Sequence, residues 1–294
     1  MTETLDVKTR LAEVRQRIAS AAQASGRAAD TIHLIAVTKY AAIDQIREVV
    51  QLGHRDLGEN HVQSLMQRAA LVDEWAARAS HLPSSLPSAG MPDLLALPIR
   101  WHLIGPVQTA KARKAVELAR LIHTVENLRI AEALHDESVD REVATDILVQ
   151  INASGEATKG GIPLPAVPYL IETIESMPGL RCRGLMTMAP HGASESDLRR
   201  CFSRCREVFE DARSEGTAGA HFDVLSMGMS DDYEIAISEG ANIVRIGSAI
   251  FGDPDPAAAV NTPLSEQNTP EIDSNNPGNA SPQRDGPGDE TALR

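Results

Sequence analysis

A lysine directly after an apolar, β-branched run is the first residue whose chemistry stands out. Lys39 follows Ile35-Ala-Val-Thr38, so its stem starts near a core while its amine can reach solvent. Partial desolvation and nearby cations lower the pKa of an amine and expose the lone pair that a Schiff base with an aldehyde requires. Lysines that merely end a strand in water are common, so this residue alone leaves both interpretations open.

A second chemical signal follows the apolar run 243–246. Gly247 lets backbone N–H groups approach an anion, Ser248 adds a hydroxyl, and a following helical turn points its positive end at the ligand. The same pair also forms ordinary tight turns. In a preceding loop, Ser226 is our candidate for a second phosphate donor. Met227 offers a polarisable surface to an aromatic ring, although methionine near a strand end is more often core filler.

Three further positions carry polar groups at the ends or in the middle of apolar runs. Arg245 alternates with two apolar neighbours, so it points inward if they pack outward. A buried guanidinium then needs a partner, either a carboxylate of another strand or a ligand atom. Asn60 follows Glu59, which is a possible acid or pairing partner. His102 has apolar neighbours, and such histidines are more often hydrogen-bonded core groups than catalysts.

The elements that position these residues follow a βαβ pattern between residues 32 and 252. A helical pattern follows each of the first seven β-branched runs, and another helix, about Leu5–Ala24, precedes the first. Eight runs predict one α/β domain, a (β/α)₈ barrel over residues 1–252, whose active site lies at the carboxyl ends of the strands. The runs are Ile32–Val37, Arg55–Gly58, Trp101–Gly105, Leu121–Val125, Ile147–Asn152, Arg183–Met188, Phe222–Ser226 and Ile243–Gly247.

Helix starts and cysteines add local expectations. Ser194, three residues before Asp197, predicts a capping box, and Ser230 before two acids predicts another helix cap. Cys201 and Cys205 stand four apart on a predicted helix and could share a metal, but helix packing is favoured, and we expect no metal site. Three cysteines without a Cys-x-x-Cys motif argue against a disulfide framework and fit a reducing compartment.

Composition narrows the class of function. The 294 residues are 42% hydrophobic and 23% charged, as in soluble globular proteins, and the net charge of −13 disfavours nucleic acid and anionic membranes as partners. Without a membrane-length apolar run or a signal segment, we expect a cytoplasmic protein. Residues 81–97 read as a Pro/Ser-rich surface loop, and residues 253–294, with eight acids and seven prolines, as a disordered tail.

In combination, the motifs of this chain resemble those of the pyridoxal-phosphate homeostasis protein family. The resemblance runs in order from the first helix to Gly252, and the insertion and the tail lie outside it. It rests on Ala36-Val-Thr-Lys39, Leu57-Gly-Glu-Asn60, Trp101-His-Leu-Ile-Gly105, Val149-Gln-Ile-Asn152 with Glu156 and Lys159-Gly160, Leu225-Ser-Met-Gly-Met-Ser-Asp231 and Val244-Arg-Ile-Gly-Ser-Ala-Ile-Phe-Gly252.

The resemblance implies a barrel similar to the N-terminal domain of bacterial alanine racemase, with pyridoxal 5'-phosphate (PLP) as the cofactor. Lys39 then forms the internal aldimine, and Asn60 lies beside the ring. Arg245 faces the pyridine nitrogen. The residues implied to hold the phosphate are Ser226, Gly247 and Ser248. Many members have Thr where this chain has Ser248, and the hydroxyl is kept.

Arg245 also bears on the choice between binding and catalysis. A fixed cation at the ring nitrogen makes the ring a weaker electron sink, and a racemase needs a second base, which in alanine racemase is a tyrosine from another domain. Tyr40, Tyr169 and Tyr233 are not in such a module. We therefore expect a monomeric, non-catalytic PLP carrier, with PLP-dependent apoenzymes as recipients. The alternatives are an amino-acid racemase and a phosphate-sugar barrel enzyme that uses Lys39 as an aldolase-type amine.

Overall fold

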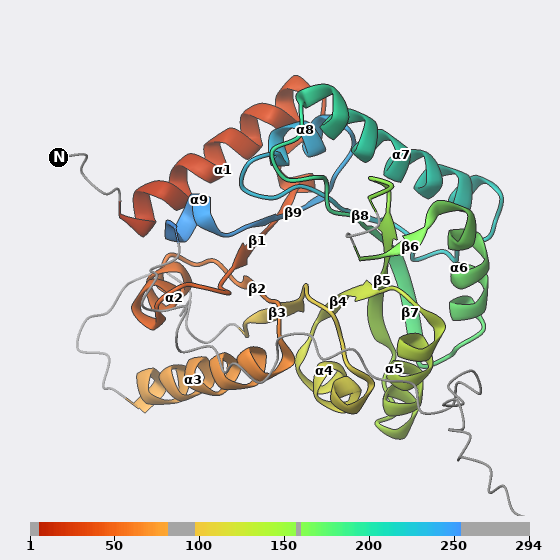
Figure 1. Cartoon of the computed structure of the whole chain (residues 1–294). Coiled ribbons are helices and arrows are strands. Elements are labelled where there is room, and N and C mark those ends of the chain that lie inside the picture. The colour runs from red at the N-terminus through yellow and green to blue at the C-terminus, as the bar shows by residue number, and fades with distance from the viewer. Residues whose placement is uncertain (1–5, 82–97, 157–159, 254–294) are drawn as a thin grey trace, which may run out of the picture.

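Parallel strands close into a barrel in the computed structural model, which describes residues 6–81, 98–156 and 160–253 (Figure 1). Pairing runs in the order β1-β2-β3-β4-β5-β7-β8-β9, and β9 pairs back with β1. This ring confirms the eight predicted strands and the predicted fold, with strand boundaries that differ from the prediction by at most three residues. The strands are β1 His33–Val37, β2 Asp56–Glu59, β3 Arg100–Leu103, β4 Leu121–Val125, β5 Thr145–Asn152, β7 Leu180–Met186, β8 Val224–Ser226 and β9 Ile243–Ile246.

A ninth strand lies outside the ring. β6, Ile162–Pro163, pairs with β5 alone, where Ile151 stands opposite Ile162. Two residues, one of them a proline, are too few for an alternating pattern, so the sequence gives no sign of this strand.

Helices cover the outside of the ring, one after each strand of the barrel (Figure 1). The additional N-terminal helix α1 packs across α8 and α9, and Arg17 of α1 forms an ion pair of 2.8 Å with Glu234. Within the described residues no helix has the length and apolarity needed to cross a membrane. The helices are α1 Val7–Ala24, α2 Ile43–Gln51, α3 Val62–His81, α4 Ala112–Leu118, α5 Leu128–Asp140, α6 Val167–Glu175, α7 Glu195–Ser214, α8 Tyr233–Ser238 and α9 Ser248–Phe251, with 3₁₀ turns at Ala29–Thr31, Thr109–Lys111 and Leu164–Ala166.

Two hydrophobic clusters follow from the alternation of side chains along the strands. The larger cluster fills the layer between the strands and the helices. The smaller one lies inside the barrel, because its members alternate along the strands with residues of the larger cluster. Its fully or nearly buried members are Ile35, Leu121, Leu148, Met186, Val224 and Ile243.

Helix α7 begins and packs as its sequence predicts. The Ser194 hydroxyl accepts a hydrogen bond from the Asp197 amide at 3.2 Å, and the Asp197 carboxylate accepts from the same hydroxyl at 2.7 Å, so the N-cap half of the predicted capping box is confirmed. Cys201 and Cys205 are buried in the main core, so the packing prediction for them is confirmed. Burial raises the pKa of the Cys201 thiol to about 11.

The second predicted helix cap is wrong. Helix α8 begins at Tyr233, after Asp232 as the N-cap residue, so Ser230 stands two residues before the capping position. Its hydroxyl turns instead toward the start of α9. Of the predicted surface loop 81–97, only His81, the last residue of α3, is described, and the predicted tail lies outside the described residues apart from residue 253.

Gly105 lies where the segments after β2 and β3 come into contact. A Cβ atom on this residue would overlap the backbone carbonyl of Asn60. The carbonyl belongs to the main chain and cannot rotate away, so the two segments must separate if residue 105 carries a side chain.

We predict that Gly105→Ala lowers the free energy of unfolding by about 2–3 kcal/mol, because backbone must move to admit the methyl group. Gly26→Ala is the matched control, since Gly26 has a φ of +69° and open space around its Cβ position. There we expect a loss of about 1 kcal/mol from the left-handed backbone alone. Urea titration of both variants measures the difference, and equal losses would contradict the contact.

Candidate functional site

Lys39 and Gly247 lie at the same end of the barrel, each just after one of two neighbouring strands. In the parallel pair β1–β9, Ala36 stands opposite Ile246. Lys39 therefore lies just beyond the end of β1, and Gly247 lies just beyond the end of β9. A Cβ on Gly247 would stand 3.4 Å from the carbonyl oxygen of Val37, which is ordinary contact. The two candidates are thus neighbours at the carboxyl ends of the strands, where barrel enzymes place their sites.

Lys39 is an exposed residue at this end of the barrel. Its Nζ lies 4.6 Å from the centre of the Tyr40 ring, which is itself 46% exposed. The backbone carbonyl of Lys39 accepts a hydrogen bond of 3.4 Å from Nη2 of Arg68. The main chain at Lys39 is therefore tied to α3, while the amine stays accessible.

Glu59 lies buried beside this lysine. Its Oε1 accepts hydrogen bonds from the Thr38 hydroxyl and forms an ion pair of 3.1 Å with Nε of Arg68, which confirms the pairing alternative for this acid. Its Oε2 is buried and has no hydrogen-bond partner among the described residues. Burial raises the pKa of Glu59, against the opposing effect of the Arg68 and Lys39 charges.

The two residues predicted beside an aromatic ring lie in different surroundings. Asn60 is half-buried at the end of β2, with its carbonyl against Gly105. Met227 is 0% exposed and belongs to the main core, so its sulfur does not line an open surface. Met229, two residues on, is 36% exposed.

Backbone amides and one hydroxyl meet at the start of α9. The amides of Gly247 and Ala249 both donate to the Ser230 hydroxyl oxygen, each at 3.3 Å. Bonds of this length are weak, and they mark a place where two N–H groups converge on one acceptor. Ser248, between the two amides, is exposed. We call Ser230, Gly247, Ser248 and Ala249 the anion cradle; Ser230 is the member that sequence reasoning missed.

Ser226 lies inside the barrel rather than in the anion cradle. It is 0% exposed, and its hydroxyl accepts a 2.6 Å hydrogen bond from Nη1 of Arg245. Nη2 of Arg245 donates to the Thr187 carbonyl at 2.9 Å. The inward orientation predicted for Arg245 is confirmed, and its partners in the described part of the chain are a hydroxyl and a carbonyl rather than a carboxylate. Burial lowers the pKa of Arg245 to about 10, so the guanidinium stays protonated at neutral pH.

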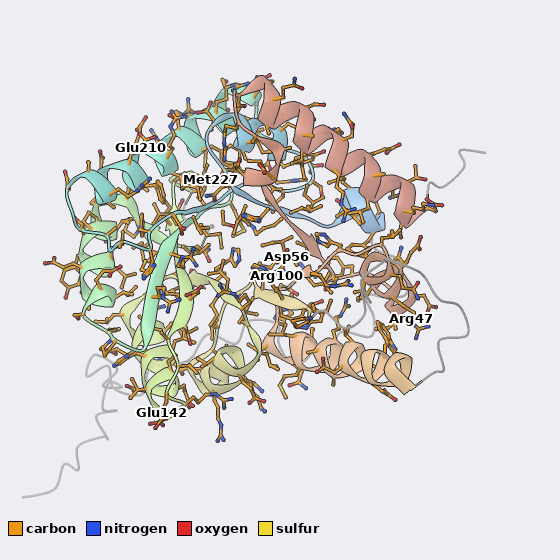
Figure 2. All side chains as sticks on the ribbon, turned by 180° about the vertical axis from the view of Figure 1, so that it is seen from behind. Arg47, Asp56, Arg100, Glu142, Glu210 and Met227 are labelled. Atoms are coloured by element: carbon orange, nitrogen blue, oxygen red, sulfur yellow. The ribbon has the colours of Figure 1, made fainter. Side chains whose placement is uncertain are left out.

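His102 is a hydrogen-bonded core group, as predicted. One ring nitrogen lies 3.1 Å from His123, and the other lies 3.2 Å from the carboxylate of Asp56. Asp56 also forms an ion pair of 2.5 Å with Arg100. Figure 2, viewed from behind, shows Asp56 and Arg100 together near the middle of the ring of strands.

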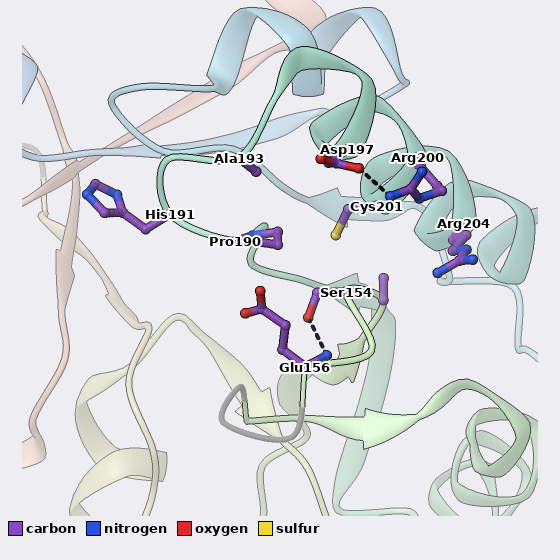
Figure 3. Close-up of a pocket in the computed structure, with 10 residues that line it drawn as sticks. Ser154, Glu156, Pro190, His191, Ala193, Asp197, Arg200, Cys201 and Arg204 are labelled. Carbon is purple, nitrogen blue, oxygen red and sulfur yellow. Dashed lines mark hydrogen bonds and ion pairs between the residues drawn. The ribbon is translucent and has the colours of Figure 1, made fainter.

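A cavity of about 400 Å³ opens between the loops after β5 and β7 and the first turns of α7 (Figure 3). Arg200 and Asp197 on its helical wall form an ion pair. Ser154 and Glu156, on the opposite wall, are joined by a hydrogen bond of 3.2 Å from the Glu156 amide. The cavity carries charges of both signs and does not include Lys39 or the anion cradle among its lining residues.

Comparison with known proteins identifies relatives of the whole barrel. Residues 10–255 match the family model described as alanine racemase, N-terminal domain. The pyridoxal phosphate homeostasis protein of Pseudomonas aeruginosa is 37% identical over 245 residues, which cover 83% of this chain and 94% of that protein.

Solved structures agree with this match. The structure of PipY from Synechococcus elongatus with PLP bound has a TM-score of 0.67 and 27% sequence identity, and the match covers 84% of this chain and all of PipY. An alanine racemase from Corynebacterium glutamicum, at 15% identity and a TM-score of 0.58, shares the fold over 86% of this chain and 64% of its own. The chain belongs to the family of pyridoxal phosphate homeostasis proteins, built on the N-terminal domain fold of alanine racemase.

Proposed function

We propose that this protein binds PLP and acts in PLP homeostasis, with Lys39 as the amine that forms a Schiff base with the cofactor and the anion cradle as the phosphate site. The observation that carries the proposal is the pairing of β1 with β9, which brings an accessible amine and a converging pair of backbone amides to the same end of two adjacent strands. The printed names of the relatives, and the PLP bound to PipY, support the same ligand.

The polar groups of the site fit such a ligand. Ser230 holds the two cradle amides at 3.3 Å, which leaves both able to make shorter, charge-assisted bonds to a phosphate oxygen. Beside Lys39, the buried Oε2 of Glu59 has no partner in the described part of the chain, and a buried carboxyl oxygen without a partner is costly. A ligand group or an ordered water at this end of the barrel would satisfy it.

Each residue has a distinct task in this proposal. PLP supplies an aldehyde that condenses reversibly with an amine. The exposed side chain of Lys39 presents that amine, while Arg68 holds the main chain beneath it. Glu59, whose pKa is raised by burial, pairs with Arg68 and the Thr38 hydroxyl and so anchors the segment that carries this lysine. Arg245 faces the pyridine nitrogen, and Asn60 lies beside the ring.

We propose that Ser230 supplies the phosphate-binding hydroxyl, a role that the sequence analysis gave to Ser226. Ser226 already accepts from Arg245 in the barrel interior, whereas Ser230 touches the amides of Gly247 and Ala249. Ser248 offers a second hydroxyl at the open edge of the anion cradle.

We further propose that the protein carries PLP rather than using it for catalysis. Arg245 stays protonated and donates hydrogen bonds only, so a pyridine nitrogen that faces it accepts a hydrogen bond and does not take up a proton. The ring is then a weak electron sink. Delivery of PLP to dependent apoenzymes, a monomeric state and a cytoplasmic location complete the proposal.

Amino-acid racemisation is the second candidate, because the fold is that of a racemase domain. It requires a base on each face of the substrate. Among the described tyrosines, Tyr40 stands next to Lys39 and Tyr169 is 67% exposed on α6, whereas Tyr233 is buried. Exchange of the α-proton of added amino acids with deuterated solvent distinguishes a racemase from a carrier, which leaves that proton in place.

We predict that borohydride treatment of the protein with PLP attaches a phosphopyridoxyl group to Lys39, because only an imine is reduced to a stable amine. Peptide mass spectrometry locates the group. Lys39→Ala should lose it completely, whereas Lys114→Ala, which removes a partly exposed lysine of α4, should keep it. An unmodified Lys39 peptide, or a group on another lysine, would defeat the assignment.

We predict that Ser230→Ala weakens PLP binding about tenfold, because one hydrogen bond to an ionised phosphate is worth roughly 1.5 kcal/mol. Affinity for pyridoxal, which lacks the phosphate, should not change, and neither should PLP affinity in the control Ser238→Ala at the end of α8. Absorbance titration measures both ligands. Equal loss of PLP and pyridoxal affinity in Ser230→Ala would remove this residue from the phosphate site.

A further inference from the structure

A chain of hydrogen bonds crosses the barrel interior from β2 to β9. Oδ1 of Asp56 lies 3.2 Å from Nε2 of His102, and Nδ1 of His102 lies 3.1 Å from Nε2 of His123. On β8, the Ser226 hydroxyl lies 3.0 Å from Nδ1 of His123. Arg245 Nη1 donates to the same hydroxyl at 2.6 Å. The half-buried Asp56 and three buried side chains, those of His102, His123 and Ser226, thus connect the start of β2 with the guanidinium on β9.

Chemical roles at the two ends of this hydrogen-bond chain, and above all at Asp56, set the direction of its bonds. Arg245 can only donate, so the Ser226 hydroxyl oxygen accepts from it, and the hydroxyl hydrogen remains available to a lone pair on Nδ1 of His123. Asp56 as a carboxylate can only accept, so His102 donates to it from Nε2. The bond between the histidines then runs from Nε2–H of His123 to Nδ1 of His102. With both rings neutral, this direction places the hydrogen of each ring on Nε2, and the Ser226 hydroxyl donates to Nδ1 of His123.

The opposite direction is excluded by the acid end. A hydrogen on Nδ1 of His123 would require one on Nδ1 of His102, and a neutral His102 would then turn a lone pair toward the Asp56 carboxylate. Burial lowers the pKa of His102 and of His123, which disfavours a charged ring. Burial also pushes the pKa of Asp56 upward, but hydrogen bonds from Arg100 and His102 outweigh it, so the acid stays ionised.

The hydrogen-bond chain helps to stabilise the buried positive charge of Arg245. Its side chain is 3% exposed, and its acceptors, the Ser226 hydroxyl and the Thr187 carbonyl, are neutral. A buried cation without a directly bonded counter-ion is unfavourable. The nearby Asp232 charge and the polarised chain that ends on Asp56 both compensate it, because successive hydrogen bonds of one direction strengthen each other.

We infer that Asp56, His102, His123 and Ser226 are positioning residues for Arg245: they hold its guanidinium in the orientation that meets the ring nitrogen of the cofactor. The inference rests on the proposed PLP site. It also gives Ser226 a role through Arg245 instead of a contact with phosphate.

The first test needs no cofactor. In the cofactor-free protein labelled with ¹⁵N-histidine, long-range ¹H–¹⁵N spectra at neutral pH report which ring nitrogen carries the hydrogen. We expect the Nε2–H form for His102 and His123, with signals assigned through His102→Asn and His123→Asn. An Nδ1–H form or a charged ring at either position would overturn the inference.

The second test separates positioning from a general loss of packing. Ser226→Ala should weaken PLP and pyridoxal alike, about tenfold, and shift the absorption maximum of the bound ligand, since Arg245 loses its acceptor. Ser226→Thr restores the hydroxyl and should reverse both effects. Ser138→Ala is the matched control, because it removes an equally buried hydroxyl that bonds Leu134 and Thr145 outside the barrel.

The outcomes of the second test are decisive in either direction. Unchanged affinity and spectrum in Ser226→Ala, or the same changes in Ser138→Ala, would overturn the positioning role. Failure of the inference and failure of the proposed function remain distinguishable. If no adduct forms on Lys39, the proposed function is wrong, but the Nε2–H forms of the histidines can still be observed. If the histidines carry their hydrogen elsewhere, the inferred hydrogen-bond chain is wrong, but the Lys39 adduct can still form.

Discussion

Parallel pairing of β1 with β9 closes the barrel and fixes the positions of three groups: the amine of Lys39, the guanidinium of Arg245 and the anion cradle. Ile35 lies opposite Arg245 and Ala36 opposite Ile246, so Lys39 and Gly247 emerge together just beyond the strands. A shift of one residue would turn the guanidinium from the interior to the helical layer, because side chains alternate along a strand. The amine, the cation and the anion cradle are therefore fixed relative to one another by backbone pairing rather than by their own contacts.

The barrel interior combines an apolar layer with a polar one. Val224 and Ser226 share the inner face of β8, as Leu121 and His123 share that of β4. Buried polar groups are tolerated only when their hydrogen bonds are made. The chain from Asp56 to Arg245 meets this condition. It thereby places a permanent cation in the interior close to the carboxyl ends of the strands. The carrier role that we propose needs binding and orientation of PLP there, without carbanion chemistry.

Much of this arrangement could be predicted from the sequence. The alternation of apolar residues around Arg245 predicts its inward orientation, and the repeated β-branched runs predict the barrel, because both depend on local periodicity. The destinations of Ser226 and Ser230 could not be predicted. Four residues apart in one segment, they separate because Gly228, with a φ of +91°, turns the chain where a Cβ would collide with Tyr233 and Ala236. That contact depends on tertiary packing.

A crystal structure of the protein with PLP measures the central relation directly, since one small ligand must reach two strands at once. The account predicts continuous electron density from Nζ of Lys39 to the cofactor, with phosphate oxygens within hydrogen-bond distance of the amides of Gly247 and Ala249. A cofactor bound elsewhere, or with its phosphate away from these amides, would contradict it.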